Sequence, residues 1–226
     1  GYSGNGRRNQ MNNKPILIAS FILGAFAVLG VGLVSATYEA TKERIAYNER
    51  LSLLRKLQAI VPADTVDNDM ITDRIMVHNP GLLGSDSTCV YRGRKNGAPV
   101  AAVLTTIVPD GYGGPIKLLV AVRKDGSLGG VRVVSHKETP GLGDKIEEER
   151  SDWIYSFKDK SLENPPLEQW KVKRDGGHFD QFTGATITPR SIVNSVKNVL
   201  LFVQQQGAVI YEQAPQATAA KSQEKS

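Results

Sequence analysis

The sequence predicts an α+β protein, in which a single N-terminal transmembrane helix is followed by a domain of helices packed on an antiparallel sheet. Three observations predict this class. Residues 15–38 form a long block without a charged side chain, and residues 88–135 alternate β-branched runs with turn pairs. Residues 189–206 carry apolar side chains at helical spacing.

The composition excludes several classes of function. The chain has 226 residues with 40% hydrophobic and 23% charged side chains, which fits a folded protein rather than a fibrous or disordered one. A single cysteine, Cys89, excludes an intramolecular disulfide framework and a cysteine-ligated metal cluster. The three histidines are scattered along the chain, so we expect no metal site.

The net charge of +5 has a local origin. Residues 1–37 contain Arg7, Arg8 and Lys14 and no acidic residue, so the remainder of the chain is closer to neutral. We therefore expect no nucleic-acid partner, and we interpret the basic arm as the cytoplasmic flank of a membrane helix.

The uncharged block over residues 15–38 is predicted to cross a membrane. A helix of this length spans about 36 Å, which exceeds the ~30 Å hydrocarbon core. The competing interpretation is a cleaved signal peptide, because Val34-Ser35-Ala36 resembles a cleavage site. The apolar region of a signal peptide is only about 7–15 residues long, so an uncleaved anchor is favoured. Residues 1–14 are then a cytoplasmic arm, in which residues 1–10 precede Met11 and are interpreted as an added leader.

Residues 39–87 are predicted to be a stalk helix and a connection. Ile45, Leu54, Leu57 and Val61 continue an apolar stripe along a charged helix, which Pro62 ends. The following residues, 62–87, are rich in Asp, Asn and Gly and are predicted to be irregular, with a short helix at most.

The compact domain is predicted over residues 88–211. Two hairpins, with turns at Asn96-Gly97 and Asp125-Gly126, supply the sheet. A helix is expected over Asp144–Phe157, then a polar loop to residue 181, and a last helix from Pro189 to about Gln206. Residues 212–226 lack periodicity and are predicted to be a disordered tail.

The most informative stretch is DQFTGATITPR, residues 180–190. Thr188 is predicted to cap the last helix, with Pro189 at the first helical position. The turn before this cap is made of small and hydroxyl residues: Thr183, Gly184, Ala185 and Thr186. A helix N-terminus attracts anions, so Thr186 is expected to be an accessible hydroxyl beside a phosphate site. The residues alone also allow the simpler interpretation of a turn followed by a cap.

This stretch resembles the D-x-x-[ST]-G-A-T flavinylation motif of FMN-binding domain proteins. The chain is also similar to the G subunit of the Rnf (Rsx) ion-translocating electron-transport complex, and more distantly to the C subunit of the sodium-pumping NADH:quinone reductase. The similarity rests on separated blocks in the same order: the apolar helix, APVAAVLTTIVPDGYGGPIKLLV, ETPGLGDKIE followed by SDWI, and DGGHFDQFTGATITPRSIVNSVK. The motif itself shows no departure from the family pattern.

The resemblance implies a covalent FMN, esterified through its phosphate to the Thr186 hydroxyl. A separate flavin transferase would attach it with FAD as donor, and the recognition positions would be Asp180, Thr183, Gly184 and Ala185, with Thr188 beside them. The protein would be an electron carrier in a translocase that couples ferredoxin and NAD(H) to ion movement, without stand-alone catalysis. It would lie in the bacterial inner membrane with a periplasmic domain. Its partners would be other Rnf subunits, including integral membrane proteins and a second flavin-carrying subunit.

Two further loops supply weaker candidates for flavin contacts. The block ETPGLGD contributes Thr139, Gly141 and Leu142, although the same residues also suit a loop that leads into a helix cap. Tyr112, in the turn DGYGG, could stack on the flavin ring or serve only the turn. The alternative function is an anchored periplasmic binding or scaffolding domain without a cofactor.

Overall fold

The computed structural model describes residues 14–212. The predicted leader, most of the cytoplasmic arm and the predicted disordered tail beyond Glu212 lie outside the described residues. Contacts divide the chain into two compact units, one up to Ser52 and one from Leu53 onwards. The fold class is confirmed: a long apolar helix, a five-stranded antiparallel sheet and further helices.

The N-terminal helix α1 covers Lys14–Ile60 without a break. Its apolar part is long enough to cross a membrane by length and composition. The large apolar side chains from Ile16 to Val34 are exposed, as expected of a helix whose surface faces lipid. The predicted charged continuation of the helix as far as Pro62 is confirmed to within two residues.

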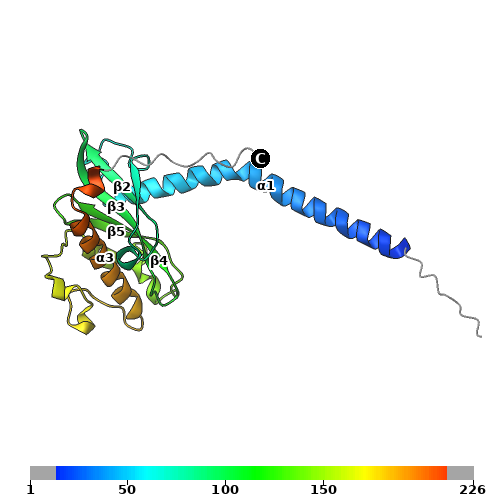
Figure 1. Cartoon of the computed structure of the whole chain (residues 1–226). Coiled ribbons are helices and arrows are strands. Elements are labelled where there is room, and N and C mark those ends of the chain that lie inside the picture. Colours follow the sequence, from blue (N-terminus) through cyan, green and yellow to red (C-terminus); the bar gives the residue numbers. More distant parts are fainter. Residues whose placement is uncertain (1–13, 213–226) are drawn as a thin grey trace, which may run out of the picture. The chain divides into compact units, whose positions relative to one another are not determined.

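The sheet has the strand order β1-β2-β3-β4-β5, with every neighbouring pair antiparallel. Its strands are β1 (Arg74–Val77), β2 (Thr88–Lys95), β3 (Ala98–Val108), β4 (Ile116–Arg123) and β5 (Leu128–Ser135). Both predicted hairpins are confirmed (Figure 1). The β2–β3 turn has positive φ at Asn96 (51°) and Gly97 (76°), the conformation that this residue pair favours.

The connection over residues 62–87 agrees with the prediction in one respect and differs in another. The short helix α2 (Pro80–Leu83) agrees with the expectation, but the rest is not wholly irregular, because β1 pairs with β2 at the sheet edge. Only Ile75 of this four-residue strand is buried. A strand this short shows no alternating pattern in sequence, and its pairing depends on β2.

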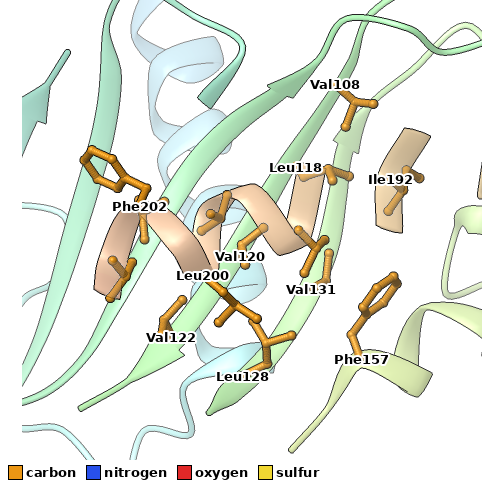
Figure 2. Packing of buried hydrophobic residues seen from close by; sticks show 14 of the residues in the cluster. Val108, Leu118, Val120, Val122, Leu128, Val131, Phe157, Ile192, Leu200 and Phe202 are labelled. Carbon is orange, nitrogen blue, oxygen red and sulfur yellow. The ribbon is translucent and has the colours of Figure 1, made fainter. Parts of the chain in front are cut away.

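Helix α3 (Ile187–Gln206) covers one face of the sheet. Figure 2 shows Val120 and Val122 of β4 and Val131 of β5 beside Leu200 of this helix. On the opposite face, the last turns of α1 bury Leu57 and Ile60 in a second cluster. Its other buried members include Val61, Met70, Tyr91, Ala101, Val103, Leu119 and Ala121. The sheet therefore has two hydrophobic faces, which explains its nearly continuous apolar strands.

The predicted helix over Asp144–Phe157 is wrong as a single element. The structure has two 3-10 helices instead, η1 (Gly143–Ile146) and η2 (Asp152–Phe157). Glu147 is extended between them, and the Ser151 hydroxyl accepts from the backbone N–H of Trp153 to begin η2. The apolar residues of both segments still contact the core, where Phe157 stacks on Phe179 with ring centroids 4.8 Å apart.

A charged network joins β2 to the C-terminal helix α4 (Val209–Glu212). The Asp73 carboxylate accepts from Arg92 Nε at 2.8 Å and from Arg94 Nε at 2.7 Å. Both guanidinium groups also donate to the carbonyl of Tyr211, at 3.4 Å and 2.5 Å respectively. Arg92 is fully buried, so this network is part of the interior of the domain.

Candidate functional site

The motif, residues 180–186, contains a tight turn over Phe182–Ala185. Its backbone is closed by the Ala185 N–H, which donates to the Phe182 carbonyl at 3.1 Å. Gly184 has φ +83°, a left-handed conformation that glycine adopts without strain. The turn leaves Thr183 and Gly184 exposed and half-buries Ala185 and Thr186.

Thr186, not Thr188, occupies the cap position of α3. The helix begins at Ile187, and the first helical bond runs from the Arg190 N–H to the Thr186 carbonyl at 3.2 Å. The Thr186 hydroxyl makes no capping hydrogen bond. The predicted capping role of Thr188 is wrong, because that residue lies inside the helix, fully buried, and its hydroxyl donates to the Glu138 carboxylate.

Glu138 connects its own loop to the turn at Gly113 and to the start of α3. One carboxylate oxygen accepts from the Thr188 hydroxyl at the start of α3, and the other accepts from the Gly113 N–H at 2.9 Å. The Glu138 backbone N–H in turn donates to the His136 ring at 2.9 Å. Sequence reasoning missed Glu138 although it selected neighbours in the same block, ETPGLGD. Neither spacing nor residue type reveals that its carboxylate is buried.

The loop that follows Glu138 is held near the motif. The carbonyl of Thr139 accepts from the N–H groups of Leu142 and Gly143, both at 3.1 Å, which closes the loop around Gly141. Leu142 is 43% exposed. Its side chain lies close to Gly184: a Cβ added to that glycine would be 3.6 Å from the Leu142 Cδ2 atom. The structure thus brings Leu142 to the motif, while Thr139 and Gly141 belong to the same loop and, among the described residues, form no hydrogen bond with the motif.

The turn that carries Tyr112 is fixed by hydrogen bonds on both sides of that residue. Besides the Gly113–Glu138 bond, the Ser191 hydroxyl of α3 donates to the Asp110 carbonyl at 2.6 Å. Tyr112 itself is 70% exposed. Its ring is therefore available for stacking, and no aromatic neighbour within residues 14–212 fixes its orientation.

Cationic side chains of the 3-10 helix η4 (Lys173–Asp175) lie along the motif. Lys173 pairs with Asp180 at 2.6 Å, and Asp175 accepts two bonds from Arg190, at 2.6 and 2.8 Å. The Arg190 guanidinium lowers the pKa of the Asp175 carboxyl. Arg174 points a guanidinium nitrogen at the Thr186 hydroxyl oxygen, 3.5 Å away.

Trp153 of η2 supports the motif from the core side. It packs on the hydrophobic core, with its ring centroid 5.2 Å from that of Phe182. Its indole N–H also donates to the Asp180 carbonyl at 2.8 Å. The start of the motif is therefore fixed by both an aromatic contact and a hydrogen bond.

The groups around Thr186 suit a phosphate that carries a flat apolar ring. A hydroxyl not used in capping, a neighbouring guanidinium and the start of a 20-residue helix together provide a nucleophile and positive potential. Leu142 and Ile187 remain 43% and 46% exposed beside the motif and offer apolar surface to a ring. On this chemistry the residues present fit an FMN group.

Replacing Glu138 by Gln is expected to lower the free energy of unfolding by about 1–3 kcal/mol. The amide oxygen can still accept from the Gly113 N–H, but the amide NH₂ then faces Thr188, whose buried hydroxyl must turn to accept and loses the carboxylate to which it now donates. Urea unfolding of the detergent-solubilised chain, followed by tryptophan fluorescence, measures the change. The exposed Glu149→Gln is the matched control and should stay within about 0.5 kcal/mol of the wild type. Equal stability of both variants would contradict the assigned role of Glu138.

The residues of the site lie within a segment that matches a known protein family. A family model described as FMN-binding domain matches residues 111–201, which hold the Tyr112 turn, the 138–143 loop and the start of α3. A second model, described as RnfG N-terminal region, matches residues 11–60 and so covers α1. The fold and the site therefore define a flavoprotein of the FMN-binding domain class with an N-terminal apolar helix.

Relatives that match most of the chain specify the family further. Proteins named as the G subunit of the ion-translocating oxidoreductase complex are 47% identical in Shewanella amazonensis and 45% identical in Pseudoalteromonas atlantica, each over 84% of this chain and 89% of the relative. The Vibrio atlanticus protein of the same name is 43% identical over 85% of this chain and 92% of its own length. The chain belongs to this family, the G subunits of the ion-translocating oxidoreductase complex.

Proposed function

We propose that the protein is a membrane-anchored electron carrier whose FMN is attached through its phosphate to Thr186. The observation that carries this proposal is the Thr186 hydroxyl at the start of α3, unused in capping and next to Arg174. An electron-transport role follows from the FMN-binding domain and from membership of the G-subunit family. The covalent linkage is the step that we add.

The attachment reaction balances with FAD as the donor. The Thr186 hydroxyl oxygen attacks the flavin-side phosphorus and forms a new P–O bond, while the diphosphate P–O bond breaks and AMP leaves. The hydroxyl proton passes to a base of a separate flavin transferase. Small neighbours in the turn, Gly184 and Ala185, leave room for the donor. The transferase would recognise Asp180 and Thr183.

The bound FMN would supply reversible electron transfer, and the chain's own residues would hold and surround it. Glu138 fixes the two loops beside α3, so that Leu142 and Tyr112 can border the ring. Attachment through the phosphate leaves the ring electronics to be set by these neighbours. No side chain of this chain needs to break a substrate bond.

In this proposal residues 15–38 cross the bacterial inner membrane, residues 39–87 connect the anchor to the FMN-binding domain at 88–211, and this domain is periplasmic. A covalent link would prevent loss of the flavin outside the cytoplasm. The partners would be the other subunits of an Rnf complex, among them integral membrane proteins and a second flavin-carrying subunit. The complex would couple ferredoxin and NAD(H) to ion translocation. The relatives' shared name, which specifies a subunit of an oxidoreductase complex, supports this assignment.

Flavin fluorescence in a denaturing gel tests the covalent linkage. The full chain is purified from membranes of cells with and without the flavin transferase. We expect a fluorescent band only with the transferase, together with a mass increase of one FMN less one water. A dark band in the presence of the transferase would contradict the carrier function and would favour the cofactor-free binding or scaffolding domain.

A further inference from the structure

The cations that contact the motif differ in how their charge is compensated. Lys173 is paired with Asp180 at 2.6 Å, and Arg190 is paired through two bonds with Asp175. Within residues 14–212, the Arg174 guanidinium forms no ion pair with a carboxylate. Its charge acts on the neighbouring Asp175 carboxylate only at a distance, so its donors stay available at the residue whose side chain faces Thr186.

The backbone around Arg174 is fixed by hydrogen bonds. The Arg174 N–H donates to the Gln181 side chain at 3.1 Å, which ties η4 to the motif. The Lys173 N–H donates to the Phe179 carbonyl at 2.7 Å, and the Gly177 N–H donates to the Val172 carbonyl at 3.0 Å. Although the Arg174 side chain is exposed, it extends from a closed loop that is anchored on both sides.

The separation of Arg174 and Thr186 suits a ligand that both residues contact better than it suits a direct hydrogen bond. At 3.5 Å, the guanidinium nitrogen is at the outer limit for bonding the hydroxyl oxygen. A phosphate attached to that oxygen would place its free oxygens farther out, within reach of a planar group that binds phosphate through two donors. A phosphodiester has lost its second ionisable hydroxyl and carries one negative charge, which a single guanidinium can balance.

We propose that Arg174 is the phosphate-binding residue of the site and neutralises the phosphodiester formed on Thr186. This inference rests on the proposed attachment of FMN to Thr186 and adds the residue that recognises its phosphate. Lys171 is a second exposed cation near Asp175, a carboxyl whose pKa is lowered mainly by Arg190 and further by the charges of Arg174 and Lys171. Among the described residues, however, its ammonium forms no hydrogen bond with the motif, so it is not assigned this role.

The test uses the full chain in detergent, purified without flavin and incubated with purified transferase and FAD. We expect Arg174→Gln to acquire covalent flavin about ten- to a hundredfold more slowly than the wild type. This is the range for losing a hydrogen bond to a charged group. Arg174→Lys should be intermediate, since it keeps the charge but loses the planar pair of donors. Lys171→Gln, which makes the same change in net charge in the same loop, should label at the wild-type rate.

A second measurement separates phosphate binding from docking of the transferase. Attachment of the flavin should raise the melting temperature of the wild type and of Lys171→Gln, and raise it less in Arg174→Gln. If Arg174→Gln and Lys171→Gln match in both labelling rate and melting shift, the inference about Arg174 is overturned while attachment at Thr186 stands. If the wild type takes up no label, the proposed function fails and the inference fails with it.

Discussion

Thr186→Ala is expected to remove covalent flavin completely, leaving a dark band in a denaturing gel even with the transferase present. The change deletes the one oxygen to which we assign the phosphate. It should leave the fold intact, because the Thr186 hydroxyl makes no capping bond and its contact with Arg174 is long, at 3.5 Å. The free energy of unfolding should therefore change by no more than about 0.5 kcal/mol.

Thr186→Ser provides the matched control for this result. Serine keeps the hydroxyl at the same position and should keep the fluorescent band and the mass increase. Fluorescence in the Thr186→Ala band would show that another residue carries the flavin, even if the protein remains a flavoprotein. Loss of the band in both variants, with unchanged stability, would point to recognition of the threonine methyl group rather than to attachment.

Asp73→Ala is expected to destabilise the domain by about 3–5 kcal/mol. The carboxylate binds both Arg92 and Arg94, and Arg92 is fully buried beneath it. Removing one member of a buried ion pair leaves the other charge in the interior without its main compensation. The Tyr211 carbonyl, which also accepts from both arginines, cannot replace a full negative charge.

Urea unfolding of the full chain, followed by tryptophan fluorescence, measures the loss. Asp159→Asn is the matched control, because Asp159 pairs with Arg123 at 2.7 Å but both side chains are substantially exposed, 64% and 36%. An exposed pair contributes at most about 1 kcal/mol. A loss for Asp73→Ala no larger than that of the control would mean that Arg92 is compensated by other groups.

Elements of the fold that depend on local sequence were predictable. The hairpin at Asn96-Gly97 combines a turn pair with β-branched strands, and α3 has both an apolar stripe and a terminal glycine, Gly207. The break within 144–157 was not predictable, because extended Glu147 interrupts a pattern whose apolar residues face the core in either conformation. The pairing of β1 likewise depends on β2 rather than on its own four residues.

The position of the motif was predictable, but the groups that hold it in place were not. The turn residues around Thr186 are contiguous, so their proximity needs no tertiary information. Glu138 is 50 positions before its partner Thr188, and Arg174 is 12 positions before Thr186. Contacts at these separations are created by folding, which explains why Thr188 resembled a cap in sequence and is a buried partner of Glu138 in the structure.

The last turns of α1 have a consequence for isolating the FMN-binding domain. Leu57 and Ile60 cover one face of the sheet, and the Lys56 ammonium donates to the Val133 carbonyl of β5 at 2.8 Å. A soluble fragment cut at Pro62 would expose Val103 and Leu119 to water and would be prone to aggregate. The N-terminal limit of a fragment that retains its own interior therefore lies before Leu53, within the helix that also supplies the anchor.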